Sequence, residues 1–355
     1  MNKRVLFIYQ NAFSQTGGIQ TFNKYFIKAL ENINKKNNLN IEIASIYDEE
    51  NDIKTNLKKF VFNKSKFKAL MFILKNIFSY DIFIFAHVNF APLALIVKTF
   101  NPKAKIIFCS HGIEIWKKLP KYTEYIMQKS IILTVSNYSK EQLLKYNLKL
   151  VEKNIIIFPN CIEIKEENNN INPYENDTFN LLSVTRLSNT EKLKGVDLVI
   201  KSLPTLITKI PNIKYNIIGK GDDIYRLKNI AKELGVEKYV NFLGYVEKLE
   251  PYYKHCDIFI LPSKKEGFGI VYLEAMRYKK PCIACDVGGQ TDVVIDNYNG
   301  FLCFYGDIKC LEDKIYLLYQ DKNLRIKLGE NGYSHLMNNF TFEKFEKRLE
   351  KVLMS

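Results

Sequence analysis

The sequence lacks any run of about 18 uninterrupted apolar residues, which is the length that a membrane-spanning helix requires. Its first residues, MNKRVLFIYQNAFSQTGG, contain no long apolar segment followed by a small-residue cleavage site, so no secretory signal peptide is indicated. We therefore expect a cytoplasmic protein rather than an integral membrane or secreted one.

Cysteine pairs with the spacing of metal ligands are also scarce. The seven cysteines are an odd number, and most lie inside apolar runs such as KIIFCSHG and GFLCFYG. Cys282 and Cys285 form one C-x-x-C pair without a second pair elsewhere, so a zinc or redox role is disfavoured. We expect reduced, buried thiols and no bound metal.

The 355 residues, 47% of them hydrophobic, are enough for two domains of ordinary size. Their charge is uneven. Residues 1–160 contain 24 Lys and Arg against 11 Asp and Glu, whereas residues 161–355 contain 28 against 27. The net charge of +14 therefore belongs almost entirely to the first half.

Residues 54–80 contain seven lysines and no acidic residue, interleaved with Phe60, Phe62, Phe67, Phe72 and Phe78. This composition suits a surface that binds anionic lipid headgroups, which would make the protein peripheral on the inner face of the cytoplasmic membrane. It equally suits a solvated basic helix with a buried aromatic stripe. Nucleic acid is not an expected partner, because no nucleic-acid-binding motif accompanies the charge.

Short apolar runs alternate with longer amphipathic segments along the whole chain, which is typical of buried parallel strands in βα units. The pattern occurs twice, separated by the Asn-rich, charged segment 163–180, which we interpret as a linker. We expect an α/β protein with two Rossmann-like doubly wound domains, residues 1–165 and 176–340, facing each other across a cleft. Residues 341–355 have helical apolar spacing and could pack on either domain, including back on the first.

The second half contains the strongest candidate site residues, each just after a predicted strand. Arg186, Lys192 and Lys194 lie in a polar loop before a helix expected to begin near Val196, where cations and helix amides favour a diphosphate. The segment IIGKGDD places Gly219 and Gly221 where a ligand can approach the backbone, but it lacks the third glycine of the dinucleotide fingerprint.

The segment EGFGIVYLEAM, residues 266–276, contains two glutamates eight positions apart. We expect Glu266 in the loop after a strand and Glu274 on the helix that follows, which should start near Phe268 to Ile270, with glycine amides at the helix start available to a phosphate. Further on, Gly288 and Gly289 predict a second backbone anion cradle. Alternatively, the glutamates are ordinary helix and surface residues.

In the first half, residues 11–26 form a glycine-bearing loop between the first strand and the first helix. His111, in CSHGIEIW, follows another strand and is one of only four histidines, so we consider it a candidate functional residue. His87 is similarly placed, but a histidine there also serves packing.

The pieces GGIQ, SHG, VSNYSKEQL, PNC, RLSNTEKLKG, GKGDD, EGFGIVYLEAM and DVGGQTDVV occur in one order along nearly the whole chain. In that order they resemble the retaining GT-B glycosyltransferases of the group 1, family 4-like kind, which act in lipopolysaccharide and exopolysaccharide biosynthesis. The glutamates separated by seven residues, together with the upstream Arg and Lys-Gly, are the specific part of the resemblance.

The resemblance implies a nucleoside diphosphate sugar as donor and a glycan or lipid-linked acceptor, with no metal or other cofactor. By analogy, Arg186 and Lys194 neutralise the diphosphate, Glu266 binds the donor sugar, and Glu274 binds the ribose. His111 corresponds to the family histidine near the sugar and the acceptor. The remaining implied donor contacts are glycines and loop backbone: Gly17, Gly18, Gly219, Gly221, Gly267, Phe268, Gly269 and Ile270.

Three departures from the family pattern matter. The loop between Arg186 and Lys194 is longer than usual, which leaves Lys192 as an alternative phosphate ligand. Cys161 stands where glycine is common, and Gln290 and Thr291 replace the usual residues after the double glycine. Two alternative functions share the fold: a nucleotide-sugar 2-epimerase, and a noncatalytic nucleotide-sugar-binding subunit.

Overall fold

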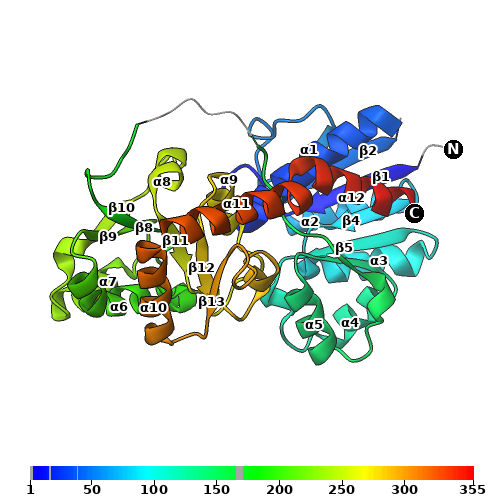
Figure 1. Cartoon of the computed structure of the whole chain (residues 1–355). Coiled ribbons are helices and arrows are strands. Elements are labelled where there is room, and N and C mark those ends of the chain that lie inside the picture. The colour runs from blue at the N-terminus through cyan, green and yellow to red at the C-terminus, as the bar shows by residue number, and fades with distance from the viewer. Residues whose placement is uncertain (1–2, 16, 38, 165–170) are drawn as a thin grey trace. The chain divides into compact units, whose positions relative to one another are not determined.

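The computed structural model describes residues 3–15, 17–37, 39–164 and 171–355. The chain divides into two compact units: unit 1 is Met1–Cys161 together with Phe342–Ser355, and unit 2 is Ile162–Thr341 (Figure 1). Residues 165–170 of the predicted linker 163–180 lie outside the described residues. The last two residues of that linker belong to a strand that begins at Phe179. Among the described residues, no helix is long and apolar enough to cross a bilayer.

The described part of unit 1 contains a parallel sheet in the order β3-β2-β1-β4-β5-β6-β7. Its central strands are apolar on both faces and fully buried, as parallel strands covered by helices must be. The order reverses beside β1, which pairs with both β2 and β4. The strands are β1 (Arg4–Tyr9), β2 (Asn40–Ser45), β3 (Lys58–Val61), β4 (Ile82–Phe85), β5 (Lys105–Ser110), β6 (Ile131–Thr134) and β7 (Ile155–Ile157).

The helices of unit 1 include one from the end of the chain. Helix α12 (Phe342–Met354) lies beside α1 (Gly18–Asn37), as the red and blue helices of Figure 1 show. Its apolar spacing explains this position, because Phe345 packs edge-on against Phe22 with 5.6 Å between ring centroids. The other helices are α2 (Lys66–Asn76), α3 (Ala91–Phe100), α4 (Lys121–Gln128) and α5 (Asn137–Tyr146).

The basic segment 54–80 is not one helix, contrary to one of the two interpretations of its composition. It contains strand β3, a turn in which Asn63 and Lys64 have positive φ, and then helix α2, capped by the Ser65 hydroxyl. Its phenylalanines separate accordingly. Phe62 is buried and Phe72 packs on it, whereas Phe67 and Phe78 are exposed.

The described part of unit 2 has a parallel sheet in the order β10-β9-β8-β11-β12-β13, which repeats the reversal found in unit 1. The predicted class, two doubly wound α/β domains, is therefore confirmed. The strands are β8 (Phe179–Val184), β9 (Ile213–Ile218), β10 (Val240–Gly244), β11 (Ile258–Leu261), β12 (Cys282–Cys285) and β13 (Gly300–Cys303). The helices are α6 (Val196–Lys209), α7 (Ile224–Glu233), α8 (Glu250–His255), α9 (Ile270–Arg277), α10 (Ile308–Gln320) and α11 (Lys322–Asn339).

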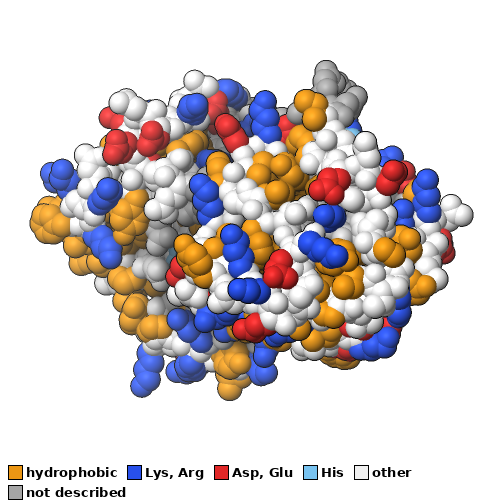
Figure 2. Space-filling model, turned by 90° about the vertical axis from the view of Figure 1, so that its left-hand side faces the viewer, with side chains coloured by type: hydrophobic (Ala, Val, Ile, Leu, Met, Phe, Trp, Pro, Cys, Tyr) orange, Lys and Arg blue, Asp and Glu red, His pale blue; other side chains and the backbone are white. Residues whose placement is uncertain are grey.

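The two units differ in charge. Unit 1 contains 28 Lys and Arg against 14 Asp and Glu, and unit 2 contains 24 of each. Figure 2 looks at the left-hand side of Figure 1, where α7 and β10 lie, and shows cationic and anionic side chains intermixed there. The basic excess is thus a property of unit 1.

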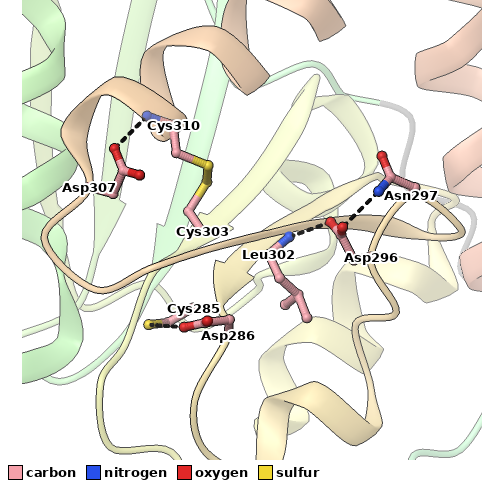
Figure 3. Close-up of a disulfide and its surroundings, with 8 residues drawn as sticks. All are labelled: Cys285, Asp286, Asp296, Asn297, Leu302, Cys303, Asp307 and Cys310. Carbon is pink, nitrogen blue, oxygen red and sulfur yellow. Dashed lines mark hydrogen bonds between the residues drawn. A yellow bond between two sulfur atoms is a disulfide. The ribbon is translucent and has the colours of Figure 1, made fainter.

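The expectation of seven free thiols is wrong for two of them. Cys303 at the end of β13 and Cys310 in the first turn of α10 form a disulfide, with Cα atoms 5.8 Å apart (Figure 3). They meet because the chain turns back at residues 304–307, where Asp307 caps α10 by accepting from the Cys310 N–H at 2.9 Å. The other five cysteines are buried and not disulfide-bonded, including Cys282 and Cys285 in β12.

Candidate active site

The best-defined candidate site lies in unit 2, where the strand order reverses between β8 and β11. Ligands of open parallel sheets bind outside the carboxyl ends of strands at such a reversal, because the loops of the two neighbouring strands diverge there. The loop after β8 contains Arg186 and Lys194, and the loop after β11 contains Glu266. The structure thus brings together residues that are far apart in the sequence.

These two loops touch backbone to backbone. Gly195 has φ +78°, and a Cβ added there would lie 2.2 Å from the carbonyl oxygen of Pro262. The Lys264 N–H also donates to the Leu193 carbonyl at 2.8 Å. Only glycine permits this approach, so the position of Lys194 relative to Glu266 is fixed by the backbones on either side.

The loop after β9 also contacts the β8 loop through backbone atoms. Gly221 has φ +155°, and a Cβ there would meet the Leu187 carbonyl oxygen at 1.9 Å. Leu187 also donates its N–H to Lys220 and accepts one from Asp223. Gly221 and its neighbour Gly219 therefore hold the β8 loop in place, a role that is independent of contact with a ligand.

Lys194 and Glu266 form an ion pair of 2.8 Å, with side chains only 18% and 19% exposed. Lys192, the alternative phosphate ligand, is exposed and lies near Asp222 instead. An ammonium group has three N–H donors, and the pair with Glu266 uses one of them. Of the two lysines, Lys194 is therefore the one that pairs with Glu266, and it still has N–H donors for an anion.

Arg186 pairs with Glu191 of its own loop at 2.6 Å, and its side chain is 69% exposed. Such an exposed pair is worth little, roughly 0–1 kcal/mol, so an incoming dianion can displace Glu191. The five N–H donors of a guanidinium suit phosphate oxygens in particular.

Glu274 lies one turn into α9, where its carboxylate accepts a hydrogen bond from the Tyr253 hydroxyl of α8 at 2.7 Å. Burial raises the pKa of the Glu274 carboxyl, although the bond from Tyr253 and the charge of Arg277 act in the opposite direction. Burial, with the nearby charge of Glu274, also raises the pKa of Tyr253. The hydrogen bond from Tyr253 thus fixes the orientation of the Glu274 carboxylate.

The turn between Glu266 and Glu274 forms the N-terminal end of helix α9. Gly269 is the N-cap residue of α9, which begins at Ile270 as predicted. The Phe268 side chain is buried and packs edge-on against Phe340, so only the backbone of Phe268 is available to a ligand. Gly267 precedes it at the end of the Glu266 loop.

The predicted anion cradle at Gly288 and Gly289 is wrong for the backbone amide of Gly289. The Gly289 N–H donates to the Glu266 carbonyl oxygen at 2.7 Å, so it is not available to a ligand. The Gln290 side chain donates to the Ser263 carbonyl oxygen at 2.7 Å. This segment therefore positions the Glu266 loop.

The candidate residues of unit 1 also follow strands. The loop between β1 and α1 is organised by the buried Asp48 carboxylate, which accepts the N–H groups of Ala12, Phe13 and Ser14 at 2.8–3.1 Å. Gly17 and Gly18 follow that loop, and α1 begins at Gly18. A hollow of about 480 Å³ beside it is lined by Gln10, Asn11, Ser14, Gln15, Gln20, Tyr47, Glu49, Asp52 and Lys64.

His111 follows β5, and its Nε2 lies 2.7 Å from the carbonyl oxygen of Ala86. A carbonyl oxygen only accepts, so Nε2 carries the proton. Burial lowers the pKa of His111, against an upward contribution from Glu114, and therefore favours a neutral ring. The neighbouring His87, whose ring centroid is 6.1 Å away, accepts the Asn89 N–H through Nδ1 and caps a short 3-10 turn.

Comparison with known proteins shows a likeness to one family over the second part of the chain. Residues 164–335 match the family described as glycosyl transferases group 1. Over these residues the chain is similar to the group 1 glycosyltransferases. The match covers nearly all of unit 2 and includes Arg186, Lys194, Glu266 and Glu274, whereas His111 lies outside it.

Two relatives of this chain illustrate the likeness. It is 31% identical over 166 residues to N-acetyl-alpha-D-glucosaminyl L-malate synthase of Bacillus anthracis, covering 47% of this chain and 43% of the relative. It is 26% identical to the capsular polysaccharide biosynthesis glycosyltransferase CapM of Staphylococcus aureus, covering 68% and 67%. The chain spans about half the length of the first curated relatives it matches.

Among solved structures, Anabaena Alr3699/HepE in complex with UDP superimposes with a TM-score of 0.83 at 18% identity, over 99% of both chains. This likeness shows the fold, and the GT-B prediction is confirmed.

Sequence reasoning missed two residues that hold candidate residues in place, one in each unit: Tyr253 beside Glu274, and Asp48 beside the β1–α1 loop. Tyr253 looks like any apolar helix residue in EPYYKH, and Asp48 stands in an acidic run with Glu49 and Glu50. No local pattern separates them, because their partners are distant in the sequence.

Proposed function

We propose that this chain transfers a sugar from a nucleoside diphosphate sugar to a glycan or lipid-linked acceptor, with retention of anomeric configuration, in surface polysaccharide or lipopolysaccharide biosynthesis. The Lys194–Glu266 pair at the reversal of strand order carries the proposal. It sets a partly buried cation beside a carboxylate, which is what a phosphate joined to a hydroxyl-bearing ring requires. The UDP bound in the Anabaena structure and the capsular role in the name of CapM support the donor and the acceptor class.

Each residue has a role that follows from its contacts. Lys194 donates its remaining N–H groups to the diphosphate, and Arg186 exchanges Glu191 for a phosphate oxygen. Glu266 accepts hydrogen bonds from the donor sugar, and Glu274, held by Tyr253, accepts them from the ribose. These cations belong to the protein itself, so the proposal invokes no metal.

The reaction breaks the bond between the anomeric carbon and the phosphate oxygen and forms a bond from that carbon to the acceptor oxygen on the same face. The acceptor proton passes to the departing phosphate. Negative charge grows on the diphosphate as the bond breaks, so Lys194 and Arg186 stabilise the transition state more than the ground state. His111 takes part through position rather than proton transfer at Nε2, because Nε2–H is bound to the Ala86 carbonyl.

The test compares two lysines of one loop. Lys194→Met should lower kcat/KM by roughly 100-fold or more, the usual effect of removing one group that stabilises developing charge. Lys192→Met removes the same charge two residues away, outside the ion pair, and should change kcat/KM less than about threefold. Glu266→Ala should abolish turnover in a folded protein.

The assay quantifies nucleoside diphosphate released from each common nucleoside diphosphate sugar, without and with membrane extract. The anomer of the product is read by NMR. Equal activity of the two lysine variants would refute the assignment of the site, and an inverted product would refute retention.

A further inference from the structure

Helix α2 of unit 1 exposes a row of apolar side chains. Phe67, Met71, Leu74 and Phe78 are 70%, 38%, 41% and 77% exposed. Their spacing of four, three and four residues places them along one side of the helix and its C-terminal extension. We call these four residues the α2 stripe.

The α2 stripe is not a displaced part of the core. The opposite side of the helix is buried through Ala69, Ile73 and Ile77. Phe72 anchors the helix on strand β3, because its ring centroid lies 4.4 Å from that of Phe60. The helix is therefore already packed, and the stripe is left for something outside unit 1.

The lysines around the stripe are free to meet anions. Lys64, Lys66, Lys68 and Lys75 are exposed, and among the described residues none of them makes an ion pair. Two earlier lysines of the segment are used within the fold: Lys58 pairs with Glu42 at 3.0 Å, and Lys59 donates to backbone carbonyls. The surface of α2 is thus apolar and cationic without a carboxylate of its own.

We infer that α2 docks unit 1 on an anionic lipid bilayer. Aromatic and aliphatic side chains enter the interface between headgroups and acyl chains, while lysines remain with the phosphates. The helix is about 16 Å long at 1.5 Å per residue, so it lies in the plane of the interface and does not cross a core of about 30 Å. The cores of protein interfaces are poor in lysine, so a protein partner fits this surface less well.

This inference goes beyond the proposed transfer and needs no donor or acceptor to be tested. It also agrees with the charge of the two units. Unit 1 has a net charge of +14, which attracts an anionic surface, whereas unit 2 has a net charge of zero.

The experiment is co-sedimentation of the full chain with phosphatidylcholine vesicles containing 30% phosphatidylglycerol, or none, at about 100 mM salt, near the physiological screening range. Phe67→Ser with Phe78→Ser should weaken binding to the anionic vesicles at least tenfold. The matched control, Tyr225→Ser with Phe304→Ser, changes side chains of similar exposure, 75% and 73%, in unit 2 and should have no effect.

A second pair of variants tests the charge. Lys66→Glu with Lys68→Glu should weaken binding at least tenfold, and Lys228→Glu with Lys232→Glu on α7 less than threefold. Equal loss from the α2 and control variants would overturn the proposal, as would the absence of binding to anionic vesicles. Self-association that depends on the stripe, without vesicle binding, would instead identify a second copy as the occupant. Nucleoside diphosphate release in solution distinguishes all these outcomes from failure of the proposed transfer.

Discussion

Gly195 is not among the predicted ligand-contacting residues, but replacing it by alanine should still disturb the candidate site. At φ +78° an alanine costs about 1 kcal/mol, the usual penalty of a left-handed backbone. Its Cβ would also lie 2.2 Å from the Pro262 carbonyl oxygen, whereas such contacts are essentially never under 3.0 Å. The two loops must therefore separate by about 0.8 Å.

That separation has a calculable minimum cost. It weakens the hydrogen bond from Lys264 to Leu193, which contributes about 1 kcal/mol, and it pulls Lys194 away from Glu266. We expect Gly195→Ala to lower the free energy of unfolding of unit 2 by at least about 2 kcal/mol, the sum of the backbone and hydrogen-bond costs. A displacement of this size in a catalytic constellation also lowers kcat/KM by roughly 100-fold.

Gly235→Ala is the matched control, because Gly235 has φ +66° and no atom within 4 Å of an added Cβ. It should cost only the backbone term of about 1 kcal/mol and leave activity unchanged. Urea unfolding followed by circular dichroism measures both variants. Trp116, the single tryptophan, reports unit 1 in the same samples by fluorescence. If the two variants lost equal stability and kept equal kcat/KM, the close approach of the loops would be refuted.

Three further predictions concern residues that support the two units. Tyr253→Phe removes the donor to Glu274 and should cost about 1–3 kcal/mol of stability by calorimetry and raise the KM for the donor; an unchanged KM would separate Glu274 from donor binding. Asp48→Asn weakens the three N–H bonds of the β1–α1 loop, costing about 2 kcal/mol, and should speed hydrogen exchange at residues 12–14; unchanged exchange would contradict this role. Burial of Glu31 opposes its charge, but hydrogen bonds from Lys35, Asn56 and Thr55 outweigh burial and lower its pKa to about 2. Its stabilisation is thus present above the unfolded pKa near 4.3 and is lost as pH falls toward 2. Glu31→Gln should destabilise by about 2 kcal/mol at pH 6 and by much less at pH 3, and a pH-independent difference would count against the pKa shift.

The sequence predicted elements whose signal is local. Apolar runs such as NLLSV and IFIL are strands, and the helices after the site loops begin at Val196 and Ile270, near the predicted positions. Strand β3 was hidden because its lysines resemble a solvated surface. They are tolerated because β3 is at the edge of the sheet and one of them meets Glu42 of β2.

The contacts made within and between loops were beyond sequence reasoning. The site residues were identified by position after strands, but no local pattern states that Gly289 would be used by the Glu266 backbone, or that Glu191 would pair with Arg186. The disulfide escaped for a similar reason: Cys303 and Cys310 lie in different elements, and only the turn between β13 and α10 brings them together.

The path of the chain makes unit 2 an insertion within unit 1. Unit 1 is complete only once α12 has been added to residues 1–161. The first and last segments of unit 2 are neighbours, since the Ile162 N–H donates to the Phe340 carbonyl at 3.0 Å. A fragment ending at residue 161 would expose the surface that Phe345, Leu349 and Leu353 cover. Force applied to the two ends of the molecule would therefore act first on unit 1. Unit 2 would bear no load until α12 had been peeled from its neighbours.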